Sequence, residues 1–177
     1  ELQLASIVGT DLRYDNLITE FATGNNSRGY YSNYIVGGVR KEALEPGQWS
    51  YSADATLYVT GEAAGSSQIK GEIGKGIGKT FGDVVIGVQQ NINQAPYNYT
   101  YHQNQYDTIT ASFNKESITR AYARLDISRI KLSIGLSNYL ISNHIYLNEQ
   151  QLPAQYAPAY NLTQMSVRKE FTKSNAG

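Results

Sequence analysis

The chain has 177 residues, with 15 Lys and Arg against 15 Asp and Glu, so its formal net charge is zero. This balance argues against a general nucleic-acid binder, because such proteins collect a basic surplus on one face. The chain has no Cys, which excludes disulfides, thiol catalysis and Cys-based metal sites.

Tyrosine dominates the aromatic residues, with 15 Tyr beside one Trp and four Phe. It suits half-buried strands and boundaries between apolar and aqueous phases. No run of 18 apolar residues occurs, so a transmembrane helix is excluded, whereas a membrane barrel needs only strands of about ten residues with alternate ones apolar. The chain opens Glu1-Leu2-Gln3 rather than with a basic and apolar leader. We therefore expect a removed leader or an internal piece of a longer chain.

The first part of the chain predicts strands separated by turns. Candidate strands cover 2–8, 12–21 and 30–41, with a loop at 24–27 and a Pro-Gly turn at 45–47. Residues 49–61 alternate clearly, since the odd positions from Tyr51 are apolar and the even positions are polar apart from Tyr58. A turn of small residues at 63–66 leads into the next segment.

The stretch GEIGKGIGKT, at 71–80, resembles a phosphate-binding loop but fails by spacing. The pattern needs a Gly five positions before Gly78, and that position holds Ile73. Residues 69–81 alternate with a period of two, which indicates a strand, and a second β-rich run follows at 84–88 after Gly82-Asp83. A Gly-Asp pair between two such runs predicts a tight hairpin, not the helix that follows a P-loop.

The second half of the chain contains one unclear region and one clear strand. Residues 95–106 predict a loop with aromatic anchors, and 107–114 and 118–126 are predicted to pair across 115–117. The clearest segment is 130–147, followed by a loop with two prolines and a last strand at 159–171. In that segment one side carries Ile130, Leu132, Ile134 and Leu136, and the other carries Lys131, Ser133, Gly135 and Ser137.

About nine or ten strands joined by short turns predict an all-β antiparallel meander, forming a barrel or a sandwich. Several runs exceed ten residues, whereas sandwich strands have about five to six. Their polar sides are rich in Ser, Thr, Gly and Tyr, and their apolar sides would be costly to leave in water. A transmembrane barrel places the apolar side outward and the polar side around water. We expect residues 1–177 to form a single β-barrel domain or the central portion of one.

Four stretches resemble the putative porin family of Bacteroidetes outer membranes. They are SYSADATLYVTGEAAG from Ser50, GEIGKGIGKTFGDVVIGVQQNINQAPYNY from Gly71, NKESITRAYARL from Asn114 and LSIGLSNYLISNHIYLNEQQLPAQY from Leu132. The resemblance covers most of residues 50–170, and family members look longer than this chain. It implies an outer-membrane β-barrel that lets small solutes diffuse passively, with outer-membrane lipid and other envelope proteins as its partners.

Candidate site residues follow from the barrel interpretation. Lys131, Ser133 and Ser137 are predicted to face the lumen, and Ile130, Leu132, Ile134 and Leu136 to face lipid. The candidate interfacial aromatics are Tyr97, Tyr99, Tyr101, Tyr106, Tyr139 and Tyr146. These tyrosines fit either an interfacial girdle or a carbohydrate-binding surface.

Catalysis finds little support in the sequence. His102 and His144 are the only histidines, and they are interpreted as ordinary loop or rim residues because no metal-ligand spacing joins them. The carboxylates are scattered, and we expect no enzyme activity, catalytic residue, cofactor or metal. Two other functions stay open: a non-conducting structural subunit of an outer-membrane complex, and a soluble Tyr-rich β-sandwich that binds glycans.

Overall fold

The computed structural model describes residues 2–17, 26–43, 47–78, 82–103 and 108–171. Side chains are described at 31–43, 47–78, 82–96, 99–100 and 111–171. The strands are β1 (Leu2–Leu17), β2 (Asn26–Lys41), β3 (Trp49–Gly61), β4 (Ser67–Gly78), β5 (Gly82–Asn93), β6 (Tyr101–Gln103), β7 (Thr108–Thr110), β8 (Glu116–Ile127), β9 (Leu132–Ser142), β10 (His144–Leu147), β11 (Pro153–Tyr156) and β12 (Tyr160–Lys169). The helices are the short α1 (Tyr97–Thr100) and the 3-10 turn η1 (Ser128–Ile130).

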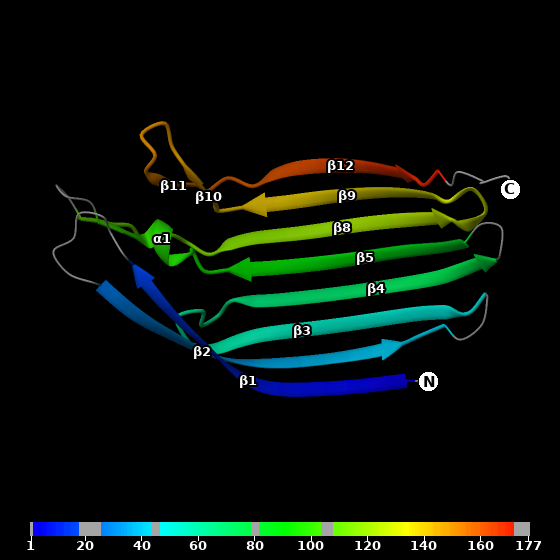
Figure 1. Cartoon of the computed structure of the whole chain (residues 1–177), viewed down its shortest axis with the longest axis horizontal. Coiled ribbons are helices and arrows are strands. Elements are labelled where there is room, and N and C mark those ends of the chain that lie inside the picture. Colours follow the sequence, from blue (N-terminus) through cyan, green and yellow to red (C-terminus); the bar gives the residue numbers. More distant parts are fainter. Residues whose placement is uncertain (1, 18–25, 44–46, 79–81, 104–107, 172–177) are drawn as a thin grey trace, which may run out of the picture.

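Eight strands form one antiparallel sheet in the order β1-β2-β3-β4-β5-β8-β9-β12, and two small hairpins, β6-β7 and β10-β11, stand apart from it. Each strand of the sheet pairs with the next one in that order (Figure 1). The predicted all-β antiparallel meander is therefore confirmed. The sheet is open, because within the described residues β1 and β12 each pair on one side only.

The connections differ between the two ends of the sheet. At one end the connections are short: three residues, 79–81, separate β4 from β5, and the turn 128–131 joins β8 to β9. The other end carries the long connections 94–115 and 143–159, which contain α1 and the two hairpins. Figure 1 shows α1, β10 and β11 together at this end. We call these the short-turn end and the long-connection end.

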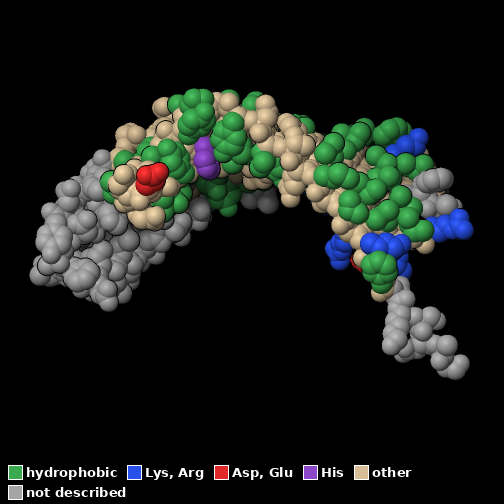
Figure 2. All heavy atoms as spheres, turned by 90° about the horizontal axis from the view of Figure 1, so that it is seen from above, with side chains coloured by type: hydrophobic (Ala, Val, Ile, Leu, Met, Phe, Trp, Pro, Cys, Tyr) green, Lys and Arg blue, Asp and Glu red, His purple; other side chains and the backbone are tan. Residues whose placement is uncertain are grey.

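The described residues form a single layer with almost no apolar core. Ala95 is the only hydrophobic residue among them that is buried, and the buried polar residues are Ser32, Ser66 and Ser137. Seen from the β12 side, the described part of the molecule curves as an arch with hydrophobic side chains along its outer side (Figure 2). The two packed layers of a soluble β-sandwich are thus not present in this part of the chain. Within the same ranges, no helix is long and apolar enough to cross a membrane.

Several predicted elements agree with the structure. The strand predicted at 49–61 is β3, and the last strand predicted at 159–171 contains β12. The hairpin that the sequence predicts in place of a P-loop is present. β4 pairs with β5, and a strand rather than a helix follows residues 79–81. The predicted turn at Gly82-Asp83 is wrong, because both residues belong to β5 and Gly82 pairs with Gly78, while the connecting residues 79–81 lie outside the described ones.

Other predicted elements are wrong. The first segment is one strand, Leu2–Leu17, rather than two, because its full length pairs with β2. The predicted loop at 95–106 contains α1 and β6. The predicted pairing of 107–114 with 118–126 does not form. Instead β7 pairs with β6, and β8 pairs with β5 in the main sheet across a 22-residue connection, 94–115.

The segment 130–147 is also divided. Ile130 ends η1 and Lys131 has φ 50°, in the left-handed region, so β9 begins only at Leu132. The strand then stops at Ser142, because Asn143 has φ 56° and the chain turns into β10.

Candidate functional site

The sheet has one polar and one apolar face, because residues paired across neighbouring strands point to the same side. The polar face carries Arg40, Ser52, Asp54, Lys70, Glu72, Gly87, Gln89, Arg120, Tyr122, Arg124, Asp126, Ser133, Ser137, Tyr139, Gln164 and Arg168. The apolar face carries Tyr51, Leu57, Ile69, Ile73, Ile86, Val88, Leu125, Ile134, Leu136, Leu140, Met165 and Val167.

Exposure to solvent is inverted relative to a water-soluble protein. In β9, Leu136 is 53 % exposed while the next residue, Ser137, on the opposite face, is 8 % exposed. Residues that pair with one another across successive strands form a register row. One such row on the apolar face contains Ile73, Ile86, Ala123, Leu136 and Met165, and its four large side chains are all exposed. The polar face is the more enclosed side, as expected on the concave side of a curved sheet.

A polar cluster crosses three strands at the centre of the polar face. Glu72 of β4 pairs with Gly87 of β5, which pairs with Tyr122 of β8. The Tyr122 hydroxyl donates a hydrogen bond to the Glu72 carboxylate across β5. A Cβ at Gly87 would collide with the Tyr122 ring, so this glycine leaves the space in which the ring lies.

The Glu72 carboxylate has two further partners. Lys70 Nζ lies 2.9 Å from Glu72 Oε2, and the Ser52 hydroxyl donates to the same oxygen at 3.4 Å. Side chains from three strands therefore satisfy this carboxylate, which is what a partly buried charge requires. The result is a fixed hydrogen-bonded group rather than a free acid.

Arg120 forms a second cluster beside the first one. Its guanidinium lies 4.5 Å from the Tyr122 ring centroid and 5.5 Å from that of Tyr139. It donates two hydrogen bonds to Ser137 Oγ, at 3.3 Å from Nε and 3.0 Å from one terminal nitrogen. Stacking on aromatic faces suits the planar guanidinium, so the orientation of this charge is fixed.

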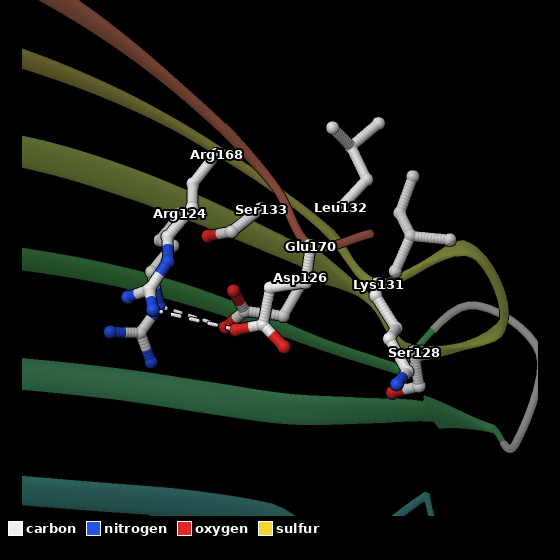
Figure 3. Close-up of a pocket in the computed structure, with 9 residues that line it drawn as sticks. Arg124, Asp126, Ser128, Lys131, Leu132, Ser133, Arg168 and Glu170 are labelled. Atoms are coloured by element: carbon white, nitrogen blue, oxygen red, sulfur yellow. Dashed lines mark hydrogen bonds and ion pairs between the residues drawn. The ribbon is translucent and has the colours of Figure 1, made fainter. Parts of the chain in front are cut away.

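Two hollows extend along the polar face towards the short-turn end. One, of about 230 Å³, is lined by Arg40, Ser52, Glu72 and Arg124 among others. The other, of about 490 Å³, is lined by charged side chains together with Ile127, Ser128, Leu132 and Ser133, and the Arg124 and Arg168 side chains point towards the Asp126 and Glu170 carboxylates (Figure 3). The distances are 2.8 Å from Arg124 to Asp126 and 3.4 Å from Arg168 to Glu170.

Aromatic side chains occur on the apolar face at the short-turn end. Lys75 Nζ lies 4.9 Å from the Trp49 ring centroid, and Lys41 Nζ lies 5.9 Å from that of Tyr51. Trp49 is 51 % exposed. Exposed rings beside Lys at the end of an apolar band are typical of a boundary between apolar and aqueous phases.

The long-connection end carries its own aromatic group. The His144 ring lies 6.5 Å from that of Tyr146 and 5.9 Å from that of Tyr160, and the Tyr156 and Tyr160 rings lie 6.1 Å apart. His144 Nδ1 also lies 2.6 Å from Glu116 Oε1. Polar bonds and ring contacts thus join the β10-β11 connection to β8 and β12.

The structure brings some of the predicted site residues together and separates others. Ser133 and Ser137 share the polar face, while Leu132, Ile134 and Leu136 share the apolar face. Lys131 and Ile130 lie in the turn before β9 rather than in its ladder. Lys131 still lines the larger hollow.

The predicted interfacial aromatics lie in different places. Tyr139 lies within the polar face, where its hydroxyl is 3.4 Å from Gln164 Oε1, and Tyr146 lies in β10. Tyr99 lies in α1. Tyr106 lies outside the described residues, as do the side chains of Tyr97, Tyr101 and His102.

Sequence reasoning missed Arg120, Tyr122 and Trp49 as site residues. A signal for the first two was present, because in 118–126 the even positions carry large or charged residues and the odd positions carry Thr119, Ala121, Ala123 and Leu125. No group of three His, Cys, Asp or Glu residues that could hold a metal occurs in the described part of the chain.

A family model described as "Putative porin" matches residues 3–176. No curated protein and no solved structure matches the chain. The match spans almost the whole sequence, including all eight strands of the sheet. The chain therefore belongs to the putative porin family.

Proposed function

We propose that this chain forms part of an outer-membrane β-barrel through which small solutes diffuse passively. The apolar face contacts lipid, and the polar face lines a water-filled lumen. Under this proposal Ser133 and Ser137 face the lumen, Lys131 lies at its short-turn mouth, and Leu132, Ile134 and Leu136 face lipid. The role is transport without catalysis.

The observation that carries the proposal is the inverted polarity of the single-layer sheet. Leu136, at 53 % exposed, lies beside Ser137, at 8 % exposed, and the pattern repeats along the central row. Burial of apolar surface away from water stabilises a protein by about 25 cal/mol for each Å², and this stabilisation is lost when such a face stays in water. Lipid covers the apolar face without any second layer of protein, which is why the arrangement supports a membrane setting.

Strand length supports the same proposal. β12 has 10 residues. At about 3.3 Å per residue such a strand is about 33 Å long. A tilt of about 40° leaves about 25 Å along the membrane normal, which equals the usual height of the apolar band of these barrels. Closure requires further pairing at the β1 and β12 edges, because an open edge leaves backbone groups unsatisfied in lipid.

The connections suggest an orientation. Barrels of this class place short turns in the periplasm and longer loops outside the cell. We infer that the short-turn end, with Trp49 and Lys75, faces the periplasm. The long-connection end, with His144 and Tyr160, then faces outward.

Two measurements on the full protein test the proposal. The first is its state in plain buffer: we expect it to require detergent, and a monodisperse species without detergent would contradict the membrane assignment and favour the soluble glycan-binding module. The second is conductance across a planar lipid bilayer. We expect discrete current steps, whereas a folded, membrane-inserted protein without steps would be the structural subunit of a larger envelope complex.

A further inference from the structure

Arg120 differs from most other cationic side chains of the polar face. Lys70 pairs with Glu72, Arg124 with Asp126 and Arg168 with Glu170. These pairs place opposite charges side by side, so their fields largely cancel a short distance away. Neither Arg120 nor Arg40, which lines the smaller hollow, has a carboxylate partner within the described part of the chain, but of these two only Arg120 has ring and hydroxyl contacts there. Its contacts are the Ser137 hydroxyl and the Tyr122 and Tyr139 rings.

The surroundings hold Arg120 ready for a ligand. Two aromatic rings and one hydroxyl restrain the guanidinium, so little side-chain freedom remains to be lost when an anion binds. The guanidinium has five N–H donors in a planar fork that matches carboxylate and phosphate oxygens. The Ser137 hydroxyl uses only Nε and one terminal nitrogen. Donors therefore remain for a solute.

We propose that Arg120, with Ser137, Tyr122 and Tyr139 around it, forms an anion subsite on the polar face, selective for small solutes that carry a carboxylate or phosphate group. The proposal rests on the lumen role proposed above, since it requires the polar face to meet passing solutes. Under this proposal Arg120, within β8, sets the ion preference, rather than Lys131 in the turn.

The test measures ion preference in planar bilayers with the full protein under a KCl gradient, with chloride as the probe anion. Arg120→Gln and Arg120→Met remove the charge, and Met retains the long apolar stem between the rings. We expect the anion-to-cation permeability ratio to fall by about twofold in both variants, the effect of removing one charge that acts on a passing ion over about one Debye length, ~8 Å at physiological salt. Lys75→Gln is the matched control, because it removes the same charge from the apolar face and should leave the ratio unchanged.

A second measurement separates the guanidinium fork from simple charge. Inorganic phosphate added at constant chloride should lower wild-type conductance by occupying the subsite. Arg120→Lys should keep the permeability ratio but lose most of the phosphate effect, because an ammonium group lacks the planar fork. This variant keeps the charge near its place, so it remains informative if the neutral variants fail to fold.

The outcomes distinguish the two proposals. If the wild-type protein gives no current steps, the porin role fails and the subsite fails with it. If the wild-type protein conducts but folded Arg120→Gln has an unchanged permeability ratio, the subsite is wrong while the porin role stands. An unchanged phosphate effect in Arg120→Lys would also overturn the proposed oxyanion site. Heat-dependent mobility in gel electrophoresis reports whether each variant is folded.

Discussion

Tyr122 reaches across a whole strand to donate a hydrogen bond to Glu72, and it can do so because the residue between them is Gly87. The three residues lie in one register row of β4, β5 and β8. The absence of a side chain at Gly87 thus links two strands that do not pair with each other. We expect this cluster to fix the curvature and rigidity of the polar face at its centre.

Gly87→Ala should destabilise the folded protein, because the new Cβ would meet the Tyr122 ring. Overpacking of this kind costs about 1–3 kcal/mol of unfolding free energy. Gly71→Ala is the matched control, since nothing lies within 4 Å of a Cβ placed there. Urea unfolding followed by fluorescence of the single Trp, Trp49, measures both variants. Equal midpoints for the two variants would show that the ring is not held against the backbone of β5.

Tyr122→Phe tests the hydrogen bond without changing the packing of the ring. Loss of a hydrogen bond to a charged group costs about 1.5–3 kcal/mol of unfolding free energy. Glu72 retains Lys70 and Ser52, so we expect the lower part of that range. Tyr139→Phe, whose hydroxyl lies 3.4 Å from Gln164 in an exposed contact, should cost about 0.5 kcal/mol or less.

A double-mutant cycle decides whether Tyr122 and Glu72 act directly on each other. The coupling free energy between Tyr122→Phe and Glu72→Gln should be about 0.5–3 kcal/mol, as for side chains in contact. Strictly additive changes in unfolding free energy would mean that the two groups are stabilised independently.

Alternation of apolar and polar residues in the sequence predicts much of the fold. In a strand with one exposed face, successive side chains point to opposite sides, so the polarity repeats every two residues. Residues 49–61 show this clearly, and they form β3 with the predicted bounds. The sequence predicts two strands in the first segment, at 2–8 and 12–21. Pairing with β2 holds it as one strand, and local sequence does not contain that information.

The site was harder to predict than the fold, because it depends on register between strands. Nothing local shows that Asn93 and Glu116 are paired after a 22-residue connection, 94–115. That pairing aligns Gly87 with Tyr122, and only then does the sequence place Tyr122 over a glycine. Similarly, Ile130 ends a 3-10 turn and Lys131 adopts the left-handed conformation. In the sequence these two residues continue the apolar-polar alternation of β9, so local pattern alone does not separate the turn from the strand.

Met165 and Gln164 are neighbours in β12 that point to opposite faces, and they offer a direct test of polarity. Met165 is 69 % exposed and lies in the same row as Leu136. If that face meets lipid, Met165→Arg should cost about 2–4 kcal/mol of folding free energy in the membrane. Gln164→Arg, at nearly the same depth on the polar face, should cost little. The yield of folded protein in lipid vesicles measures the difference, and equal yields would contradict the assignment of faces.

Gln155 fastens the β10-β11 hairpin to the rest of the long-connection end. Its side chain accepts from Asn114 N at 3.0 Å and donates to the carbonyl oxygens of Asn114 at 2.8 Å and Asn143 at 2.9 Å. Gln155→Ala should leave those backbone groups without partners, so the hairpin opens more often while the main sheet stays folded. We expect faster proteolysis within 143–159 and faster amide hydrogen exchange there, with little change in the urea midpoint.

Gln150→Ala is the control for this prediction. Gln150 is exposed, and its backbone N–H, which the substitution keeps, donates a hydrogen bond to Asn148 Oδ1. Equal proteolysis rates for the two variants would show that the aromatic contacts of His144 and Tyr160, rather than Gln155, hold the hairpin in place.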